Sequence, residues 1–367
     1  MASIEIGMGK SARQAYGLRD LSLVPSRRTR DPEDVDVSWQ IDAFRFDLPL
    51  LASALDGVVS PATAIEIGRL GGLAVLNLEG LWTRYEDPGP CYAEIATLPD
   101  DKVAARLQAM YTEPVKPELV AARVAEVRAA GVVTAGAVTP QQASQLIDVI
   151  RRAEVDLLVI QGTIVSAEHV ARQVEPLNLK TFIRQLELPV IVGGCASYQA
   201  ALHLMRTGAA GVLVGVGSGS TSTTPDVLGV GVPLATAVAD VRAARMRHLD
   251  ETGVYCQVIA DGGMTTGGDI ARAVACGADA VMLGGPLAAA REAPGGGWYW
   301  GKATYHASLP RGMRAYAEPH GTLAEILTGP GSGIDGRLNL FGGLRRSMAF
   351  CGYESLKDFQ KAEVVLR

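Results

Sequence analysis

Short apolar runs recur along the chain, and segments with helical spacing separate them. The apolar runs are residues 48–54, 73–78, 132–138, 157–161, 189–194, 211–216, 257–263 and 280–285, and helical spacing is found at 63–70, 117–130, 140–153, 198–207, 234–250 and 268–275. Strands that alternate with helices pair in parallel through right-handed crossovers. The pattern therefore predicts an α/β protein, a (β/α)8 TIM barrel of about eight units. A doubly wound open sheet is the alternative architecture.

The whole chain, residues 1–367, is predicted to form a single barrel domain with one arm and two insertions. The polar N-terminal arm covers residues 1–47, and we expect it to pack across the barrel. A short insertion (79–115) follows the second strand, and a finger and flap (292–336) follow the eighth. The finger contains an aromatic run at 298–300. Long loops at a ligand-binding face are often lids, and a contact between subunits is the alternative for this aromatic run.

Net charge, the N-terminal residues and the cysteine pattern narrow the partners and the cellular location that we expect. The net charge of −5 argues against general binding to nucleic acid or to an anionic membrane, because the protein's field attracts neither. The first ten residues have no long apolar run, so we expect no signal peptide and a cytoplasmic protein. The five cysteines are scattered without a close pair, which is typical of reduced thiols rather than of disulfides or a zinc site.

Three of the apolar runs end in glycine-rich turns. The first turn, at 214–224, is also crowded with serine and threonine, and the others end at Gly263 and Gly285. Glycine lets the backbone approach a ligand closely, and successive N–H groups can converge on an anion. In a barrel, the C-terminal ends of the strands meet at one face. The sequence therefore predicts one phosphate-bearing ligand held from three strand ends; the alternative is that the glycines serve barrel geometry alone.

The motifs of the chain resemble those of a known family in their order and spacing. They are Leu-Arg-Asp-Leu-Ser-Leu-Val-Pro at 18–25, Leu-Asp at 55–56, the glycine loop at 214–233, Ile-Ala-Asp-Gly-Gly at 259–263, Met-Leu-Gly-Gly at 282–285, Glu-Ala-Pro at 292–294, Arg-Gly-Met at 311–313 and Phe-Gly-Gly-Leu-Arg at 341–345. The combination resembles the IMP dehydrogenase/GMP reductase family, whose (β/α)8 barrels oxidise or reduce purine ribonucleotides. The paired CBS module that most IMP dehydrogenases insert after the second strand is replaced by the short segment 79–115. The chain therefore looks most like the bacterial relatives that lack this module.

The resemblance implies a set of nucleotide contacts. Residues that match the 5′-phosphate site are Ser220, Gly263, Gly284 and Gly285; Asp261, with Gly262 beside it, matches the carboxylate that accepts from the ribose hydroxyls; Gly312 and Met313 match the segment beside the base. Hydrogen bonds to a charged phosphate are of the stronger kind. From the residues alone, Asp261 has an alternative role as the N-cap of a following helix.

The resemblance also exposes a departure at the expected reactive residue. Family enzymes use a cysteine of the glycine loop that adds to purine C2, and Ser222 stands at that position. An alcohol is a far weaker nucleophile than a thiolate unless a strong base lies beside it. Cys195 is the nearest substitute, although a buried strand thiol is the favoured interpretation. Thr224 and Glu292 match a pair that relays protons in the reductases.

Further implied features concern the cofactor, an ion and the assembly. The family implies NAD or NADP as the cofactor, but Gln161 stands where relatives have an aspartate beside the nicotinamide, and Gly194 where many have an asparagine. It also implies a potassium site formed by the backbone carbonyls of Gly217, Gly219 and Ser222. It also implies a homotetramer. Further departures are Pro310 in place of a phosphate-side tyrosine and Ser332 in place of a base-reading side chain. Arg314 and Tyr316 are the only nearby match to the water-activating pair of the dehydrogenases, and the favoured interpretation is that they are ordinary loop residues.

Two functional hypotheses follow. The first is an oxidoreductase that acts on IMP, GMP or XMP, with chemistry closer to the reductases than to the dehydrogenases. The second is a nucleotide-binding pseudoenzyme or regulator, because Ser222 replaces the nucleophile while the phosphate and ribose contacts remain.

Overall fold

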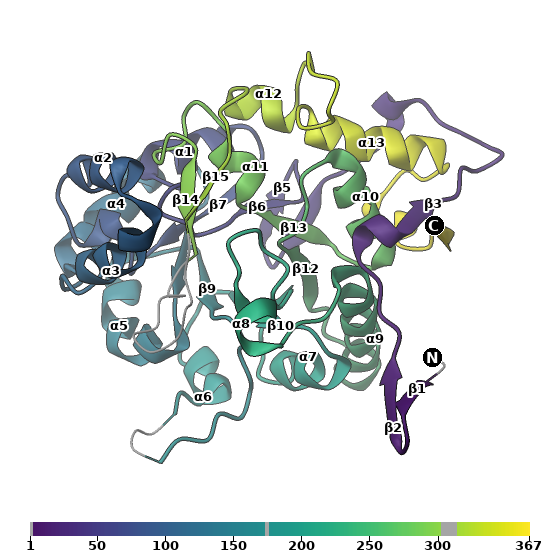
Figure 1. The fold of residues 1–367 in the computed structure, drawn as a ribbon, viewed down its shortest axis with the longest axis horizontal. Helices are drawn as coiled ribbons and strands as arrows, with labels where there is room; N and C mark the ends of the chain where they lie inside the picture. The colour runs from purple at the N-terminus through teal and green to yellow at the C-terminus, as the bar shows by residue number, and fades with distance from the viewer. Residues whose placement is uncertain (1–2, 173–175, 302–313) are drawn as a thin grey trace.

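Eight parallel strands close into a barrel in the computed structural model, which describes residues 3–172, 176–301 and 314–367 (Figure 1). The barrel strands are β6 (Leu50–Ala52), β7 (Leu73–Asn77), β8 (Ala135–Val138), β9 (Leu157–Gln161), β10 (Val190–Cys195), β11 (Gly211–Val214), β12 (Gln257–Asp261) and β13 (Ala280–Leu283). They pair in chain order, and β13 closes on β6. Each lies within one of the apolar runs, except that β10 continues one residue further to Cys195, so the predicted TIM barrel is confirmed and the open sheet is wrong.

The barrel is surrounded by the predicted helices. These are α1 (Pro61–Arg69), α4 (Pro117–Ala129), α5 (Pro140–Ala153), α7 (Tyr198–Met205), α9 (Leu234–Thr252) and α10 (Gly267–Cys276), together with the short α6 (Leu179–Arg184), which the spacing does not predict. Local signals set the ends of these helices. At the start of α1, the Ser60 side chain accepts a hydrogen bond from the Thr63 N–H, and Pro61 occupies the first helical position. Helix α9 ends at Gly253, which has a left-handed φ of 72°.

Strands β11, β12 and β13 lie side by side, which brings the three glycine turns together. In this part of the barrel Val214 is in register with Ala260, and Asp261 is in register with Met282. All four residues of β11 and of β13 are buried, because the helices cover the outside and packed side chains fill the inside. The C-terminal ends of these strands therefore open on a common face.

The N-terminal arm divides into a docked part and a projecting part. Strand β3 (Leu21–Leu23) pairs with the C-terminal strand β16 (Val364–Leu366), and the hairpin of β4 (Trp39–Ile41) and β5 (Phe44–Phe46) buries Trp39 against Phe46. Residues 3–13 instead form the exposed hairpin of β1 (Ser3–Gly7) and β2 (Lys10–Arg13), which extends away from the barrel (Figure 1). The expectation that the whole arm packs across the barrel is wrong for this hairpin.

The two insertions meet at the same side of the barrel. The segment after β7 folds into the 3-10 turn η3 (Leu81–Thr83) and the helices α2 (Gly89–Thr97) and α3 (Asp100–Met110). The finger is an antiparallel hairpin of β14 (Trp298–Trp300) and β15 (Arg314–Tyr316). Side chains from both insertions form a small second core separate from the barrel core. The aromatic run is thus covered within this chain, with Trp300 only 1% exposed.

The remaining helices complete the C-terminal part of the chain. They are α8 (Thr224–Leu228), α11 (Gly285–Ala288), α12 (Leu323–Leu327), α13 (Leu340–Phe350) and α14 (Leu356–Phe359), and two 3-10 turns, η1 (Leu18–Asp20) and η2 (Pro32–Asp34), lie in the arm. Helix α13 packs on α10, and thereby ties the flap side to the barrel wall. Within the part of the chain that the structure describes, no helix combines the length and apolarity needed to cross a membrane.

Candidate functional site

The three glycine turns converge on a cavity of about 490 Å³ at the C-terminal end of the barrel. Its wall contains the loop 215–222, residues 261–265 after β12 and residues 282–286 around the end of β13. The turns approach one another closely: a Cβ added at Gly262, where φ is 86°, would lie 2.8 Å from the Gly219 nitrogen. This confirms that the three turns share one site.

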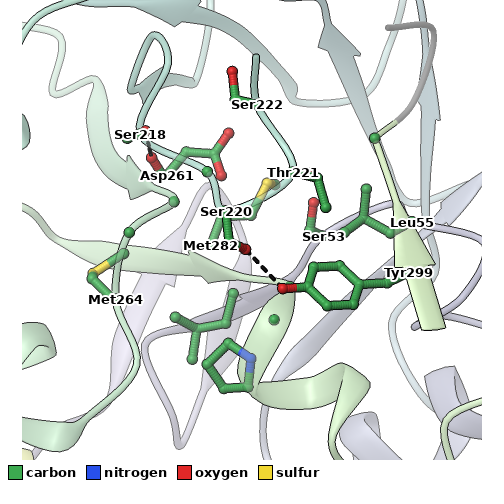
Figure 2. Close-up of a pocket in the computed structure, with 18 of the residues that line it drawn as sticks. Ser53, Leu55, Ser218, Ser220, Thr221, Ser222, Asp261, Met264, Met282 and Tyr299 are labelled. Carbon is green, nitrogen blue, oxygen red and sulfur yellow. Dashed lines mark hydrogen bonds between the residues drawn. The ribbon is translucent and has the colours of Figure 1, made fainter. Parts of the chain in front are cut away.

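The predicted phosphate residues lie together in this cavity. Ser220, Gly263, Gly284 and Gly285 all line it. The Ser220 hydroxyl is 2.8 Å from the hydroxyl of Tyr299, which enters from the finger, and the two side chains point toward one another (Figure 2). Hydroxyl and backbone N–H donors clustered in this way are suited to an anion such as a phosphate.

Asp261 lies at the end of β12 and faces the same cavity. Gln161, at the end of β9, donates a hydrogen bond from Nε2 to Oδ2 of Asp261 at 3.3 Å. Burial raises the pKa of Asp261 from 3.8 to about 6, and the bond from Gln161 lowers it in part. Helix α10 takes its N-cap bond from Thr266, so the alternative role of Asp261 as a helix cap is wrong.

Ser222 and Thr224 form a hydroxyl pair in the loop after β11. The Ser222 hydroxyl donates to Thr224 Oγ1 at 3.1 Å, and both residues line the cavity. A neutral hydroxyl is a weak base, so this contact does not activate Ser222 as a nucleophile.

Cys195 does not replace the missing thiol. It is 2% exposed, is not part of the cavity wall, and donates from Sγ to the Leu213 carbonyl at 3.4 Å. Burial raises its pKa to about 12, so the reactive thiolate is disfavoured near neutral pH. The interpretation of Cys195 as a buried strand thiol is confirmed.

Comparison with known proteins places the chain in a family. A family model described as the IMP dehydrogenase/GMP reductase domain matches residues 15–367. The chain belongs to the IMP dehydrogenase/GMP reductase family. It is 54% identical to an uncharacterized oxidoreductase of Mycobacterium tuberculosis over 98% of both chains, and 29% identical to the inosine-5′-monophosphate dehydrogenase of Methanocaldococcus jannaschii over 97% of this chain and 93% of that protein.

A solved structure of a related protein has the same fold as this chain. An IMP dehydrogenase/GMP reductase-like protein from Corynebacterium glutamicum superposes with a TM-score of 0.94 at 44% sequence identity. The match covers 100% of this chain and 98% of the other. The likeness extends over the arm and both insertions as well as the barrel.

Glu292, Gly194 and Ser332, which the family resemblance singled out, lie outside the cavity wall. The carboxylate of Glu292 accepts from the Leu323 N–H at 3.1 Å, at the start of α12, rather than joining Thr224 in the wall. Gly194 is packed at the end of β10, where an added Cβ would lie 2.4 Å from the Gly215 carbonyl oxygen. Gly312 and Met313, like Pro310, fall outside the described residues, so their contacts with the base stay predictions.

Arg314 and Tyr316 both pack against Trp298 in the finger, but only Tyr316 also lines the cavity. The Arg314 guanidinium stacks 4.0 Å from the centre of the Trp298 ring and donates to the Ile95 and Leu98 carbonyls in the insertion. Tyr316 lines the cavity. A water-activating pair needs both side chains at the substrate. The Arg314 side chain instead packs in the second core and does not line the cavity.

Several site residues were not identified from the sequence. Tyr299, Glu318 and His320 line the cavity from the finger, and Met282 lines it from β13. Tyr299 lies in the aromatic run that the sequence marks as unusual, and strand alternation is the signal that could have separated it from its tryptophan neighbours. No local pattern points to Glu318 or His320, because they reach the cavity only through the path of the finger.

The proposed potassium ligands are compatible with the loop geometry. Gly217 and Gly219 line the cavity, and the Gly219 carbonyl accepts from the Ser222 N–H at 2.9 Å. A carbonyl oxygen has a second lone pair, so this bond leaves it able to contact an ion. Across the residues that the structure describes, no group of three or more His, Cys, Asp or Glu side chains could hold a metal ion. The potassium site stays a prediction.

Proposed function

We propose that this protein binds the purine mononucleotides IMP, GMP or XMP and acts as an oxidoreductase at C2 of the base. The observation that carries the proposal is the meeting of Ser220, Asp261 and Gly285 in one cavity, which supplies donors for a phosphate and an acceptor for ribose hydroxyls. Membership of the IMP dehydrogenase/GMP reductase family supports the same class of substrate.

Among the reactions of this class, reduction fits the side chains better than dehydrogenation. Dehydrogenation of IMP requires an activated water, and the Arg314 side chain that a water-activating pair would use is only 7% exposed and stacked on Trp298. Reduction of GMP instead requires a proton for the departing amine. Thr224, which is hydrogen-bonded to Ser222 at the cavity wall, is a candidate group for delivering this proton to the amine. The carboxylate of Glu292, by contrast, is outside the cavity wall and accepts from the Leu323 N–H.

The cofactor of the proposed reaction is NAD or NADP, whose reduced form, with a dihydronicotinamide ring, would supply the hydride that reduction at C2 requires and be left oxidised. Gln161 lines the cavity and its amide is fixed on Asp261, so it offers a neutral polar surface rather than a charge. Gly194 has no room for a side chain and can offer only backbone. The neutral amide of Gln161 is compatible with the uncharged dihydronicotinamide ring, whereas Gly194 lies outside the cavity wall.

A nucleotide-binding pseudoenzyme is the second candidate, and the residues at the reactive position favour it. The Ser222 hydroxyl donates to the neutral hydroxyl of Thr224 and accepts from the Thr224 N–H, and the nearest cysteine, Cys195, is buried away from the cavity. A protein with these features keeps the binding energy for phosphate and ribose while it lacks an activated nucleophile.

One pair of experiments separates the two candidates. Purified protein is incubated with GMP and NADPH, and separately with IMP, NAD and potassium, while the absorbance of the reduced nicotinamide is followed. Calorimetric titration with IMP and GMP is carried out in parallel. A rate in the first assay supports the reductase; binding without any rate supports the pseudoenzyme; absence of both binding and turnover contradicts the proposed function.

We also propose that the protein assembles as a cytoplasmic homotetramer. The projecting hairpin of residues 3–13 is a candidate interface between subunits, because the side chains of Ile4, Ile6 and Met8 are 48%, 65% and 102% exposed. Large apolar side chains exposed together are typical of contact surfaces. Light scattering after size exclusion gives the mass, and deletion of residues 1–13 should release smaller species if the hairpin takes part.

A further inference from the structure

Strand β14 presents its aromatic side chains to two different parts of the molecule. Successive side chains of a strand point to opposite faces. Trp298 and Trp300 belong to the second core with helices α2 and α3, whereas Tyr299, 6% exposed, packs on the barrel core and lines the cavity. The position of Tyr299 is therefore set by what holds its two neighbours.

On the insertion side, Trp300 is tied to the barrel through Tyr111. The indole Nε1–H donates to the Tyr111 hydroxyl at 2.8 Å, and that hydroxyl donates to a carboxylate oxygen of Asp56. Asp56 is 2% exposed and also accepts from Asn77 Nδ2 at 3.1 Å. Buried polar groups that satisfy one another in this way fix a single geometry, because breaking any bond leaves a desolvated partner.

A second contact holds the other tryptophan of the strand. The side chain of Arg314 on β15 is 7% exposed and covers the Trp298 ring, and it donates to the Ile95 and Leu98 carbonyls at the end of α2. These bonds use the two terminal nitrogens of the guanidinium, while its buried Nε has no hydrogen-bond partner among the described residues, so the two carbonyls and the Trp298 ring hold the side chain in place. Both ends of β14 are thus anchored to the insertion, one through each tryptophan.

On the cavity side, Tyr299 meets the residues of the phosphate site. Its hydroxyl lies 2.8 Å from Ser220 Oγ, and a Cβ built at Gly285 would lie 3.1 Å from the Tyr299 hydroxyl and 3.5 Å from Ser220 Oγ. When two hydroxyls bond to each other, one donates and the proton of the other stays available for a ligand. The glycine at 285 leaves the space between them and the backbone clear.

We propose that Tyr299 binds the phosphate of the nucleotide together with Ser220, and that the helical insertion 79–115 positions it, with Tyr111 as the positioning residue acting through Trp300. The inference rests on the proposed function, since it takes the ligand to be a purine mononucleotide. It gives the insertion a role in ligand affinity although most of its residues lie away from the cavity.

The test measures dissociation constants for IMP and for inosine, the same ligand without phosphate, by calorimetry on the full chain. Tyr299→Phe removes only the hydroxyl, so we expect IMP to bind about 10- to 100-fold more weakly while inosine is unchanged. Tyr111→Phe should weaken IMP binding about 3- to 10-fold, again without an effect on inosine. Circular dichroism and thermal unfolding check that each variant is folded.

Tyr85→Phe is the matched control for the positioning role. Tyr85 belongs to the same second core and donates to the Met110 carbonyl at 3.0 Å, but this bond stays within the insertion and does not reach β14. We expect Tyr85→Phe to leave both dissociation constants unchanged. If Tyr111→Phe does not fold, Trp300→Phe removes the other partner of the same hydrogen bond and gives the same expectation.

The outcomes separate this inference from the function on which it rests. Wild-type protein that binds neither IMP nor GMP overturns both. Suppose that the wild-type protein binds IMP. If Tyr299→Phe then binds IMP equally well, or loses affinity for IMP and inosine in parallel, the phosphate role of Tyr299 is overturned and the proposed function stands. Equal losses in Tyr85→Phe and Tyr111→Phe overturn the positioning role of Tyr111, because a general loosening of the insertion would then explain both.

Discussion

At the scale of single residues, the side chain at 222 decides how much chemistry the cavity can perform. Ser222 has a neutral hydroxyl as its partner, Thr224, and its own hydroxyl is the donor in that bond. A thiol at this position ionises far more readily, since its ordinary pKa is about 8.5. We expect Ser222→Cys to raise the rate of GMP reduction by at least about tenfold, which corresponds to about 1.4 kcal/mol of the barrier.

The measurement is the initial rate with GMP and NADPH for wild type, Ser222→Cys and Ser222→Ala. A low wild-type rate that the alanine variant keeps would agree with a serine that is not a nucleophile. A high wild-type rate that Ser222→Ala abolishes would instead make serine the nucleophile and contradict this expectation. Equal nucleotide affinity in the three proteins shows that only the chemical step has changed.

Asp261 gives the site a pH dependence whose direction follows from its surroundings. Burial raises the pKa of this carboxyl to about 6, so its protonated form is present in the folded protein at pH values where a free aspartate is ionised. The folded state then binds more protons than the unfolded chain between 3.8 and about 6, and this group's contribution to the unfolding free energy falls as pH rises through that window.

Nucleotide affinity should move in the opposite direction. Only the ionised carboxylate accepts from both ribose hydroxyls, so we expect inosine to bind more tightly as pH rises from about 5 to about 7, with little change above. Asp261→Asn should flatten this profile and weaken binding about 10- to 100-fold at the upper end. Inosine is the ligand of choice because a nucleotide phosphate also titrates near pH 6. A profile that is equally steep in the variant would assign the titration to another group.

At the scale of elements, close packing of backbone fixes the finger on the barrel. A Cβ added at Gly57 would lie 2.2 Å from the Trp298 carbonyl oxygen and 2.9 Å from the Tyr299 Cα. These are backbone atoms, which cannot rotate away as a side chain can. We expect Gly57→Ala to displace β14, lower the unfolding free energy by about 1–3 kcal/mol and weaken IMP binding more than inosine binding.

Gly331→Ala is the matched control for this substitution. Gly331 lies in the flap, and the nearest atom to an added Cβ there is 3.6 Å away, which is ordinary contact. Stability from chemical denaturation and the two dissociation constants are measured for both variants. If Gly57→Ala behaves like Gly331→Ala, the finger is held less closely than the structure indicates.

The finger also shows where prediction from the sequence ends. The barrel strands were predictable because apolar runs such as that of β11 are buried on both faces, and the helices because their spacing and caps are local. The two-sided role of β14 was not, because Trp298 and Trp300 acquire their partners from helices about 200 residues earlier in the chain. The glycine turns were placed correctly because β11, β12 and β13 are neighbours in both sequence and space.

At the scale of the whole molecule, the barrel separates stability from ligand binding along its axis. Arg245 is 2% exposed and bonds to Asp279 at 2.7 Å and to Gln360 at 3.0 Å, while Asp279 also accepts from the Val258 N–H. Val258 and Asp279 lie at the N-terminal ends of β12 and β13, opposite the cavity. This buried network joins α9, two strands and the C-terminal segment without contact with the cavity wall.

Removal of one partner of such a network leaves the other charge buried and unpaired. We expect Arg245→Ala to lower the unfolding free energy by about 3–5 kcal/mol and to leave the dissociation constant of IMP within about twofold at a temperature where the variant is folded. Arg247→Ala is the control on the same helix: Arg247 is 61% exposed and its bridge to Glu251 is screened by water, so a much smaller loss is expected. Denaturant unfolding and calorimetry measure the two quantities, and a large loss of IMP affinity in folded Arg245→Ala would show that the two ends of the barrel are coupled.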